Sequence, residues 1–299
     1  MKPAPFHYLR ACSVEEALDA LAAGRHEEGS SGAHAKVLAG GQSLVALMNL
    51  RLARPDVLVD IGDLAELART FEDVDSVILG ALVRHRTLET NPMLRQRLPL
   101  VAAAASHIGH VAIRNRGTLG GSLSHADPAA ELPLAMVVHE AVLHVDSKAT
   151  GRRSIAADDF FESIFTTVMR PDELLTWVTV PSARPGQGWG FVEFAPRLGD
   201  YAQAGAACLL TVEPDGTVAA VRAGLMAAAD RPLVVSEPGD VVGDIPTEDT
   251  WERLAAHWTR TLEPMTDDPA HTHHLCREAL KQALVEAHRR ARSNEEDAA

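Results

Sequence analysis

Two short glycine-rich segments combine residue types that could bind an anion. Residues 39–44 read Ala-Gly-Gly-Gln-Ser-Leu and follow an apolar stretch, and residues 117–122 read Gly-Thr-Leu-Gly-Gly-Ser. Paired glycines leave backbone N–H groups uncovered and tolerate φ > 0, so successive N–H groups can converge on an anion. Neighbouring Ser and Thr hydroxyls add neutral donors. Two such loops could hold the pyrophosphate of a dinucleotide from both sides.

The alternative interpretation of each loop is a plain tight turn at the end of a strand. The sequence has no G-x-G-x-x-G that opens a helix and no G-x-x-x-x-G-K-[ST] phosphate loop, which are the usual nucleotide signatures. Residues 186–190, Gly-Gln-Gly-Trp-Gly, lie beside a proline-rich turn and introduce no helix. A dinucleotide held by the two loops would therefore not be bound in the Rossmann manner.

Other groups of reactive residues have simpler explanations than catalysis. Residues 271–276 read His-Thr-His-His-Leu-Cys, without the spacing of a metal site, and are expected to form an exposed helix start. Arg114 and Arg116 could contact phosphate, but hydrogen bonds to loop carbonyls are the favoured interpretation. Ser43 and Ser122 have no His–Asp partner at a recognisable spacing. We therefore predict no metal site and no catalytic residue in this chain.

The elements that must position the two loops are helices and strands in mixed order. A capping-box pattern from Ser13 to Glu16 predicts the first helix, which ends at Gly24. A Gly/Ser-rich loop follows over residues 26–35. Strands are predicted over residues 37–39, 57–61, 77–79, 141–145, 174–180, 204–212 and 218–226. Helices are predicted over residues 98–109, 133–138, 247–262 and 269–292.

The composition limits the class of protein and its partners. The chain has 299 residues, 46% of them hydrophobic, and a net charge of −13, which argues against a nucleic-acid partner. No apolar run approaches the roughly 18 residues that span a bilayer, and the start lacks a secretory apolar stretch. The 3 cysteines cannot supply the four thiolates of an iron–sulfur cluster. We expect a cytoplasmic α+β protein with a linker over residues 182–190 and a domain boundary near 182–188.

A longer stretch of sequence resembles a known family. Residues 108–133 read IGHVAIRNRGTLGGSLSHADPAAELP. Together with residues 39–44 they resemble the FAD-binding (medium) subunit of the xanthine dehydrogenase and aerobic carbon monoxide dehydrogenase family of molybdenum hydroxylases. The motif is specific because it combines I-R-N-R-G-T, L-G-G-S and A-D-P-A-A-E-L-P. The resemblance covers about residues 3–230.

The resemblance implies a fold of two domains. Residues 1–181 would form a two-part FAD-binding domain of the vanillyl-alcohol-oxidase type, with subdomains of about 1–56 and 57–181. Residues 188–292 would form a small C-terminal α+β domain of the carbon monoxide dehydrogenase flavoprotein type, a sheet packed with helices.

The resemblance also assigns residues to an FAD site. The two loops would wrap the FAD diphosphate. Asp127 and Glu131 would lie near ribose or ribityl hydroxyls, although Asp127 before Pro128 is equally good as a helix N-cap. The other residues carried over for cofactor binding are Ala39, Gly40, Gly41, Gln42, Ser43, Leu44, Ile113, Thr118, Gly120, Gly121 and Ser122.

Three further residues are implied to lie near the flavin ring. Leu174 and Leu175 match a leucine pair beside the ring, although by themselves they would be strand core. Tyr201 matches an aromatic residue against the ring, although partial burial at a strand start would explain it too. Relatives often carry a Lys on the strand before this Tyr, where this chain has Glu193. A carboxylate at the ring would lower the flavin's potential, and Arg197 could supply the missing positive charge.

The resemblance implies an electron-transfer function. A large partner subunit would carry molybdopterin and a small one two 2Fe-2S clusters, and the flavin here would pass electrons to oxygen, a quinone or NAD. Two alternatives stay open. One is a stand-alone FAD-dependent oxidase or reductase of the same fold, and the other is a non-catalytic scaffold whose glycine loops are plain turns.

Overall fold

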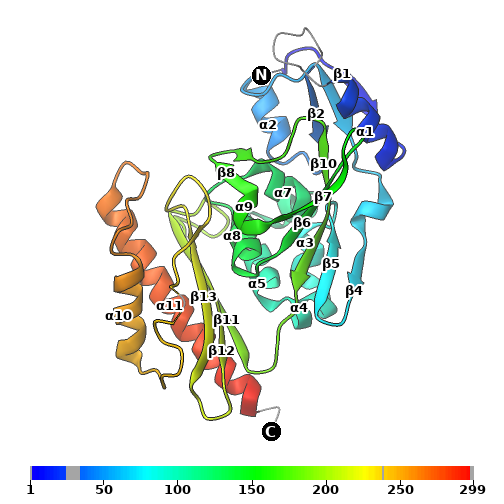
Figure 1. Cartoon of the computed structure of the whole chain (residues 1–299). Helices are drawn as coiled ribbons and strands as arrows, with labels where there is room; N and C mark the ends of the chain where they lie inside the picture. The colour runs from blue at the N-terminus through cyan, green and yellow to red at the C-terminus, as the bar shows by residue number, and fades with distance from the viewer. Residues whose placement is uncertain (1, 25–33, 238, 297–299) are drawn as a thin grey trace.

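The computed structural model of the chain describes residues 2–24, 34–237 and 239–296, and its elements form three units (Figure 1). The first two units cover the chain up to residue 181, and the third unit follows them. Helices and strands are mixed along the chain, as predicted. Nearly all of the Gly/Ser-rich loop predicted over residues 26–35 lies outside the described residues.

The first unit is a small parallel sheet of order β1-β3-β2 with two helices beside it. Val59 at its centre is buried, and helix α1 packs Ala17 and Leu21 into the same core. Because β3 is the central strand, this sheet reaches Asp60, beyond the subdomain boundary expected near residue 56. The elements are β1 His7–Arg10, α1 Val14–Ala23, β2 Ala35–Leu38, α2 Leu44–Asn49 and β3 Val57–Asp60.

Helix α1 begins at the predicted cap. The Ser13 hydroxyl accepts a hydrogen bond from the Glu16 N–H at 3.1 Å, which satisfies one of the free amides of the helix start. The Glu16 carboxylate accepts from the Cys12 N–H at 2.7 Å, one residue before the amide that a capping box would use. Gly24 ends the helix, as predicted.

The second unit is an antiparallel sheet of order β4-β5-β10-β6-β7 covered by helices. Its middle strand, β10, comes last in the sequence of this unit. The strands β5 and β6 are therefore joined into one sheet only when β10 pairs with both. The strands are β4 Thr70–Glu72, β5 Ser76–Gly80, β6 Val142–Ser147, β7 Gly151–Ala156 and β10 Glu173–Pro181. The helices are α3 His85–Thr90, α4 Pro92–Arg97, α5 Pro99–His107, α6 Val111–Arg114, α7 Leu119–His125, α8 Glu131–Val138 and α9 Ala157–Phe160.

Short elements complete the second unit. A 3-10 turn, η1 Ala65–Ala68, joins it to the first unit, and a small hairpin is formed by β8 Phe161–Ser163 and β9 Thr166–Thr167. The predicted helices over 98–109 and 133–138 are confirmed as α5 and α8, and the predicted strands as β5, β6 and β10.

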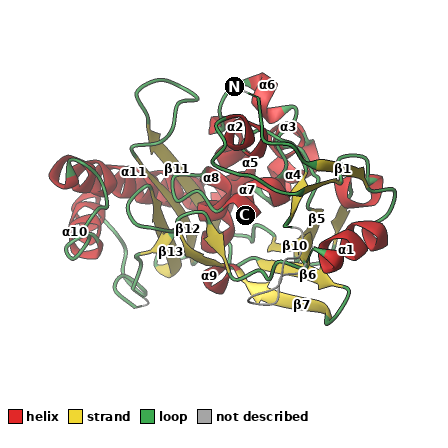
Figure 2. Cartoon of the chain, turned by 90° about the horizontal axis from the view of Figure 1, so that it is seen from above, coloured by secondary structure: helices red, strands yellow, loops and turns green. Residues whose placement is uncertain are grey.

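The third unit is an antiparallel sheet of order β11-β12-β13-β14 with two helices on its outer face. Figure 2 shows α5 and α8 between this sheet and the sheet of the second unit, where Leu100 and Leu134 meet Ala207 and Met226 in one apolar cluster. The elements are β11 Gln187–Phe194, β12 Ala204–Val212, β13 Val218–Met226, β14 Leu233–Val234, α10 Glu248–Trp258 and α11 Pro269–Glu296.

The glycines of residues 186–190 serve helix packing. A Cβ added at Gly188 would lie 1.9 Å from the Ala287 carbonyl oxygen, and one added at Gly190 would lie 2.0 Å from that of Ala283. Helix α11 therefore rests directly on the backbone of β11. The linker predicted over residues 182–190 is shorter in the structure, because this packing makes residues from Gln187 onward a strand.

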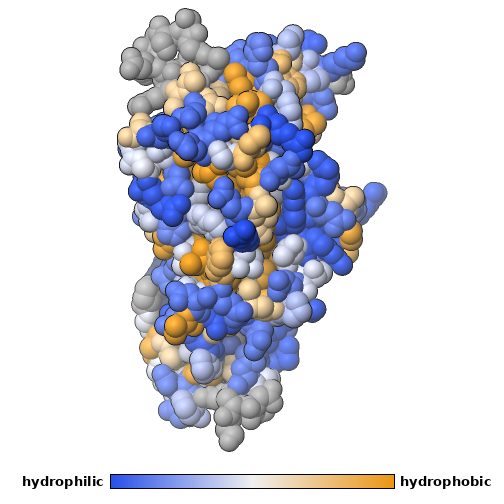
Figure 3. All heavy atoms as spheres, turned by 90° about the vertical axis from the view of Figure 1, so that its right-hand side faces the viewer, coloured by the Kyte–Doolittle hydropathy of each residue, from blue (hydrophilic) through white to orange (hydrophobic). Residues whose placement is uncertain are grey.

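The face of the molecule that carries β4 and β5 is mostly hydrophilic, with apolar side chains in small groups between polar ones (Figure 3). Phe71 and Val74, at the β4 edge, are exposed by 46% and 83%. None of the described helices combines the length and the apolar content that crossing a bilayer requires.

Candidate cofactor site

The structure brings the two glycine-rich segments into contact. A Cβ added at Gly40 would lie 2.3 Å from the carbonyl oxygen of Arg116, which leads into the second segment. A Cβ added at Gly121 would lie 4.0 Å from the Cβ of Ala39. The first segment follows β2 in the first unit and the second belongs to the helical layer of the second unit. The site is thus formed where these two units meet.

The first segment presents backbone donors. It turns from β2 into α2, and Gly41 has φ +74°, which favours glycine. Within the described part of the chain, the N–H groups of residues 40–44 donate no hydrogen bond, whereas the next one, from Val45, bonds to the Gly41 carbonyl at 3.3 Å. Successive free N–H groups at a helix start are a common binding site for phosphate oxygens.

The second segment opens a helix, so its interpretation as a strand-end turn is wrong. Thr118 is the N-cap of α7, and its hydroxyl accepts from the Gly121 N–H at 3.2 Å. Gly120 is needed because a Cβ there would lie 2.6 Å from that of Ala81. Ile113, assigned to the site by resemblance, lies on the short helix α6 and packs against Gly109.

A cavity of about 410 Å³ lies beside the first segment. Asp60 ends β3 at its wall, where its carboxylate accepts from the Gly62 N–H at 2.8 Å and from the Tyr8 hydroxyl at 2.5 Å. Arg84 and Arg116 also line it, and burial lowers the pKa of Arg84, with the charge of Arg116 adding to the effect. Cations and free N–H groups on one wall suit a diphosphate, and a carboxylate suits hydroxyl groups.

Sequence reasoning missed Asp60 and Arg84, although a signal for Asp60 was present. The strand predicted over residues 57–61 is parallel to β2 and adjacent to it. The carboxyl ends of adjacent parallel strands meet at one edge of a sheet, so Asp60 had to lie near Ala39. For Arg84 we find no such signal, because it reaches the site only through the fold of the second unit.

Arg114 has the structural role that the sequence favoured. Its side chain is buried and donates hydrogen bonds to the carbonyls of Ile108 at 2.9 Å and Gly109 at 2.7 Å. It also forms an ion pair with Glu89 at 2.9 Å. These contacts hold the 108–110 loop, against which Gly199 of the β11–β12 loop packs.

Asp127, Glu131 and Tyr201 lie close enough to one another to interact electrostatically. Asp127 accepts from the Ala129 N–H at 2.9 Å, while α8 begins at Glu131 with Ala130 as N-cap, so the N-cap interpretation of Asp127 is wrong. Burial raises the pKa of Glu131 to about 8, and the charges of Glu193 and Asp127 contribute to the rise. Desolvation and then the charges of Asp127 and Glu131 raise the pKa of Tyr201.

Tyr201 is not explained by partial burial at a strand start. Its side chain is 77% exposed, and it lies in the loop before β12, which begins at Ala204. Leu174 and Leu175, in contrast, are each only 3% exposed. They point to opposite faces of β10, Leu174 into the core of the first unit and Leu175 into that of the second.

Glu193 faces the helical layer rather than solvent. Its side chain is 4% exposed, and Oε2 lies 3.4 Å from Nδ1 of His107 at the end of α5. Within the described part of the chain, this Oε2 has no hydrogen-bond partner. Arg197 is exposed. After burial, the negative charge of Glu193 is one of the causes that raise the pKa of Glu131.

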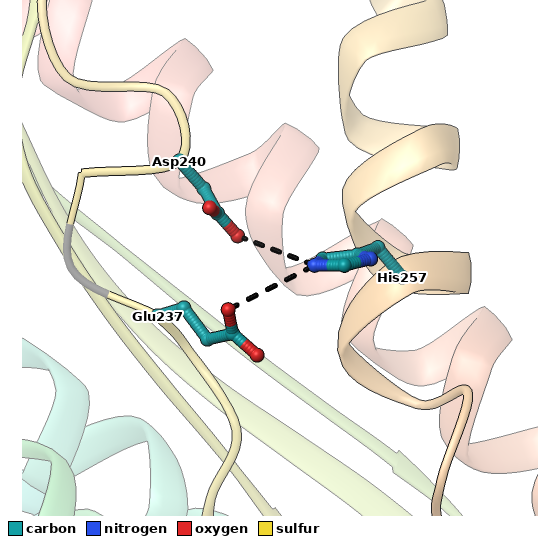
Figure 4. Close-up of side chains that lie close together, drawn as sticks. All are labelled: Glu237, Asp240 and His257. Carbon is teal, nitrogen blue, oxygen red and sulfur yellow. Dashed lines mark ion pairs between the residues drawn. The ribbon is translucent and has the colours of Figure 1, made fainter.

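One group of side chains in the third unit has the residue types of a metal site. Figure 4 shows His257 facing Glu237 and Asp240, with its Nε2 3.8 Å from a carboxylate oxygen of each. Trp258 Nε1 donates to Asp240 at 2.7 Å. Glu237, Asp240 and His257 are all exposed, and exposed acidic groups are common without a metal ion. The residues 271–276 lie at the start of α11, as predicted, but this start is not fully exposed, because Thr272 and Cys276 are buried.

Known proteins are similar to this chain in both sequence and fold. Residues 4–183 match the family model described as the FAD binding domain in molybdopterin dehydrogenase. The nicotine 6-hydroxylase medium subunit of Paenarthrobacter nicotinovorans is 37% identical over 96% of this chain and 99% of its own. The carbon monoxide dehydrogenase medium chain of Hydrogenophaga pseudoflava is 35% identical over 78% of each chain.

Solved structures extend the likeness to the whole chain. Carbon monoxide dehydrogenase from Hydrogenophaga pseudoflava, in a form which lacks the Mo-pyranopterin moiety, matches 97% of this chain and 99% of its own with a TM-score of 0.90 and 32% identity. Quinoline 2-oxidoreductase from Pseudomonas putida 86 matches 99% of this chain and 100% of its own with a TM-score of 0.89 and 32% identity. The resemblance found in the sequence is confirmed, and the chain belongs to the family of FAD-binding subunits of molybdopterin dehydrogenases.

Proposed function

We propose that this chain carries FAD as an electron-transfer subunit, receiving electrons from iron–sulfur clusters on a partner and passing them to an external acceptor. The contact between the two glycine segments carries the proposal, because it places the free N–H groups of residues 40–44 beside the start of α7. FAD supplies the redox chemistry when bound, so the protein's part is binding, orientation and electrostatics.

The diphosphate would be held by both glycine segments. Gly40, Gly41, Gln42, Ser43 and Leu44 would donate from the backbone, since their N–H groups have no other acceptor in the described part of the chain. The second segment would contribute the hydroxyl groups of Thr118 and Ser122 rather than N–H donors, because the N–H groups of residues 119–122 already have acceptors. Ala39, Ile113, Thr118, Gly120, Gly121 and Ser122 complete this part of the proposed site.

The rest of the cofactor would lie toward the third unit. Asp127 and Glu131 would accept hydrogen bonds from ribose or ribityl hydroxyls. The exposed Tyr201 would cover the flavin ring, and β10, which carries Leu174 and Leu175 on opposite faces, would lie behind it. We propose that residues 1–181 form a two-part flavoprotein domain of the vanillyl-alcohol-oxidase type and residues 188–292 its C-terminal partner.

The proposed partners are a small subunit with 2Fe-2S clusters and a large subunit with molybdopterin. The names medium subunit and medium chain of the relatives support an assembly of this kind. The acceptor would be oxygen, a quinone or NAD. A cytoplasmic location belongs to the same proposal and is supported by the free thiols Cys12, Cys208 and Cys276.

A visible spectrum of the purified chain is the first test. We expect a yellow protein that releases FAD on denaturation, identified by chromatography, at about one FAD per chain. A colourless protein that fails to take up added FAD would contradict the proposal and leave the scaffold alternative.

Purification of the native complex separates the two flavoprotein alternatives. We expect the chain to copurify with subunits that contain iron and molybdenum, and we expect reduction of those clusters to bleach the flavin. An FAD-containing chain that purifies alone and oxidises a substrate by itself would instead support the stand-alone oxidase or reductase.

A further inference from the structure

The segment of residues 81–85 lies directly behind the second glycine segment. The backbone N–H of His85 donates to the Gly117 carbonyl at 3.1 Å. In the other direction, the N–H groups of Leu119 and Gly120 donate to carbonyls of residues 81–85 at 2.9 and 2.8 Å. Main-chain bonds on both sides of residue 118 therefore fix the second segment to a strip that precedes α3.

The ring of His85 adds a further bond at the centre of this strip. His85 is 6% exposed, and its Nε2 lies 2.9 Å from the carbonyl oxygen of Thr118. Because a carbonyl can only accept, Nε2 carries the hydrogen and donates it. In the neutral ring Nδ1 is then an unprotonated acceptor. It has no hydrogen-bond partner in the described part of the chain, and a Cβ added at Gly117 would lie 2.6 Å from it.

This geometry connects the ring to the diphosphate side of the loop. The Thr118 carbonyl is held from behind by His85, while the Thr118 hydroxyl caps α7 through the Gly121 N–H. Gly121 lies beside Ala39 of the first segment. A shift of the Thr118 peptide would therefore move the helix start away from the first segment.

We propose that His85, as a neutral ring donating from Nε2, is a positioning residue that sets the second glycine segment at the distance from the first that the FAD diphosphate requires. It touches no part of the cofactor and acts through Thr118. The inference rests on the proposed FAD binding and goes beyond it by naming what holds the clamp closed.

The surroundings keep this ring neutral. Burial lowers the pKa of His85 to about 4, and the charges of Arg84 and Arg114 add to the effect. Arg114 is paired with Glu89. On α5, which packs against α3, the titratable side chain is His107, and it faces Glu193. A proton on Nδ1 would thus be a buried charge without an acceptor.

The test compares two substitutions at His85 with the same pair at a matched site. Gln places an amide N–H close to the position of Nε2 and does not titrate between pH 4 and 7.5. Leu fills the space of the ring but supplies no hydrogen-bond donor. His139 is the control, because it is also buried, its Nε2 has no hydrogen-bond partner among the described residues, and burial lowers its pKa to about 4. It ends α8 at the far end from Glu131 and bonds to the Pro181 backbone.

The full chain, stripped of FAD, would be titrated with FAD at pH 7.5 while thermal stability is measured in parallel. We expect H85L to bind FAD at least about tenfold more weakly, equal to about 1.4 kcal/mol. We expect H85Q to stay within about threefold of the wild type. The ³¹P resonances of bound FAD should shift in H85L and stay in place in H85Q. H139L should lose stability but bind FAD like the wild type.

Acid should separate wild type from H85Q. The pKa of His85 in the fold lies below its ordinary 6.5. Its contribution to the free energy of unfolding is therefore complete above about pH 6.5 and is lost as the pH falls toward about 4. The free energy of unfolding should thus fall more in the wild type than in H85Q between pH 6 and 4.5.

Each outcome supports or overturns the proposed role of His85. Equal affinity of H85L and wild type overturns the inference, and so does an H139L whose affinity falls as much as that of H85L. If H85Q binds FAD as weakly as H85L does, the Nε2 donor is not what positions the segment. A wild-type chain that binds no FAD overturns the proposed function itself, whereas one that binds FAD while H85L is unaffected overturns only this inference.

Discussion

At the scale of single residues, the site depends on positions where only a hydrogen fits in place of a side chain. Gly40 and Gly120 both face backbone or Cβ atoms of other segments at distances below 3 Å from where their own Cβ would be. Sequence reasoning selected these glycines for exposed N–H groups and left-handed backbone. The structure adds close approach as the reason, with positive φ needed at Gly41.

Substitution of Gly40 tests the contact between the two segments. The Cβ in Gly40→Ala would lie 2.3 Å from the Arg116 carbonyl oxygen, and backbone on both sides cannot give way cheaply. We expect FAD affinity, measured by flavin fluorescence, to fall at least about tenfold. Gly151→Ala is the control, because Gly151 has φ +71° but a Cβ added there would meet no atom of the described residues within 4 Å. It should cost stability and leave affinity unchanged, and equal loss in both variants would refute the contact's role.

Glu131 gives a prediction for pH. Burial, with the charges of Glu193 and Asp127, raises its pKa from 4.5 to about 8 in the chain without FAD. A raised pKa means that the folded chain binds this proton more tightly than the unfolded chain does. The contribution of Glu131 to the free energy of unfolding is therefore complete below about pH 4.5 and is lost as the pH rises to about 8. Glu131→Gln should flatten the decline of Tm over that range. The exposed Glu140→Gln should not, and an unchanged decline in E131Q would assign it to another group.

At the scale of elements, the sequence located most of the strongly patterned segments and missed the short helices α3, α4 and α6. Helices α5, α8, α10 and α11 and strands β12 and β13 were predicted because each has a sustained apolar period or a clear turn. Helices α3, α4 and α6 have few residues, and their place is set by packing against α5 and the second glycine segment. Local pattern does not record such contacts.

Strand β11 shows how packing overrides composition. Its glycines and a nearby proline predicted a linker, but Gly188 and Gly190 admit the backbone of α11. Gly190→Ala should push α11 off the sheet, because its Cβ would lie 2.0 Å from the Ala283 carbonyl oxygen. We expect a loss of about 1–3 kcal/mol in the free energy of unfolding, read from denaturant melts. Gly216→Ala, in a hairpin turn of the same sheet, adds only the backbone strain of φ +85° and should cost less, and the opposite order would contradict this packing.

At the scale of the whole molecule, the third unit is joined to the second by apolar and ionic contacts. Arg222 of β13 forms an ion pair with Asp158 of α9 at 2.7 Å and donates to the Val137 carbonyl at 3.2 Å. Its side chain is 24% exposed, so the pair is only partly screened by solvent. The contact fixes the β11–β14 sheet against the helical layer, on which Glu131 and the Tyr201 loop both depend.

Arg222→Met removes this contact and keeps the aliphatic stem. We expect a loss of about 1 kcal/mol in the free energy of unfolding and faster proteolysis between the units, since a hydrogen bond to a carbonyl is lost with the ion pair. Arg253→Met is the control, because Arg253 pairs with Asp249 on the surface with both side chains more than 70% exposed. It should change stability by a few tenths of a kcal/mol at most, and equal effects would show that the contact between units contributes nothing special.

The sequence by itself determined the family, the glycine segments and most of the main helices and strands. Motifs and apolar periods are local, so residues close in the chain carry them. Only the tertiary structure decided that Gly40 meets Arg116, that His85 supports Thr118 and that Glu193 is buried beside His107. These contacts join residues far apart in the sequence, and two of the three join different units. Their distances and burial follow from how the sheets and helices pack, which no short stretch of sequence records.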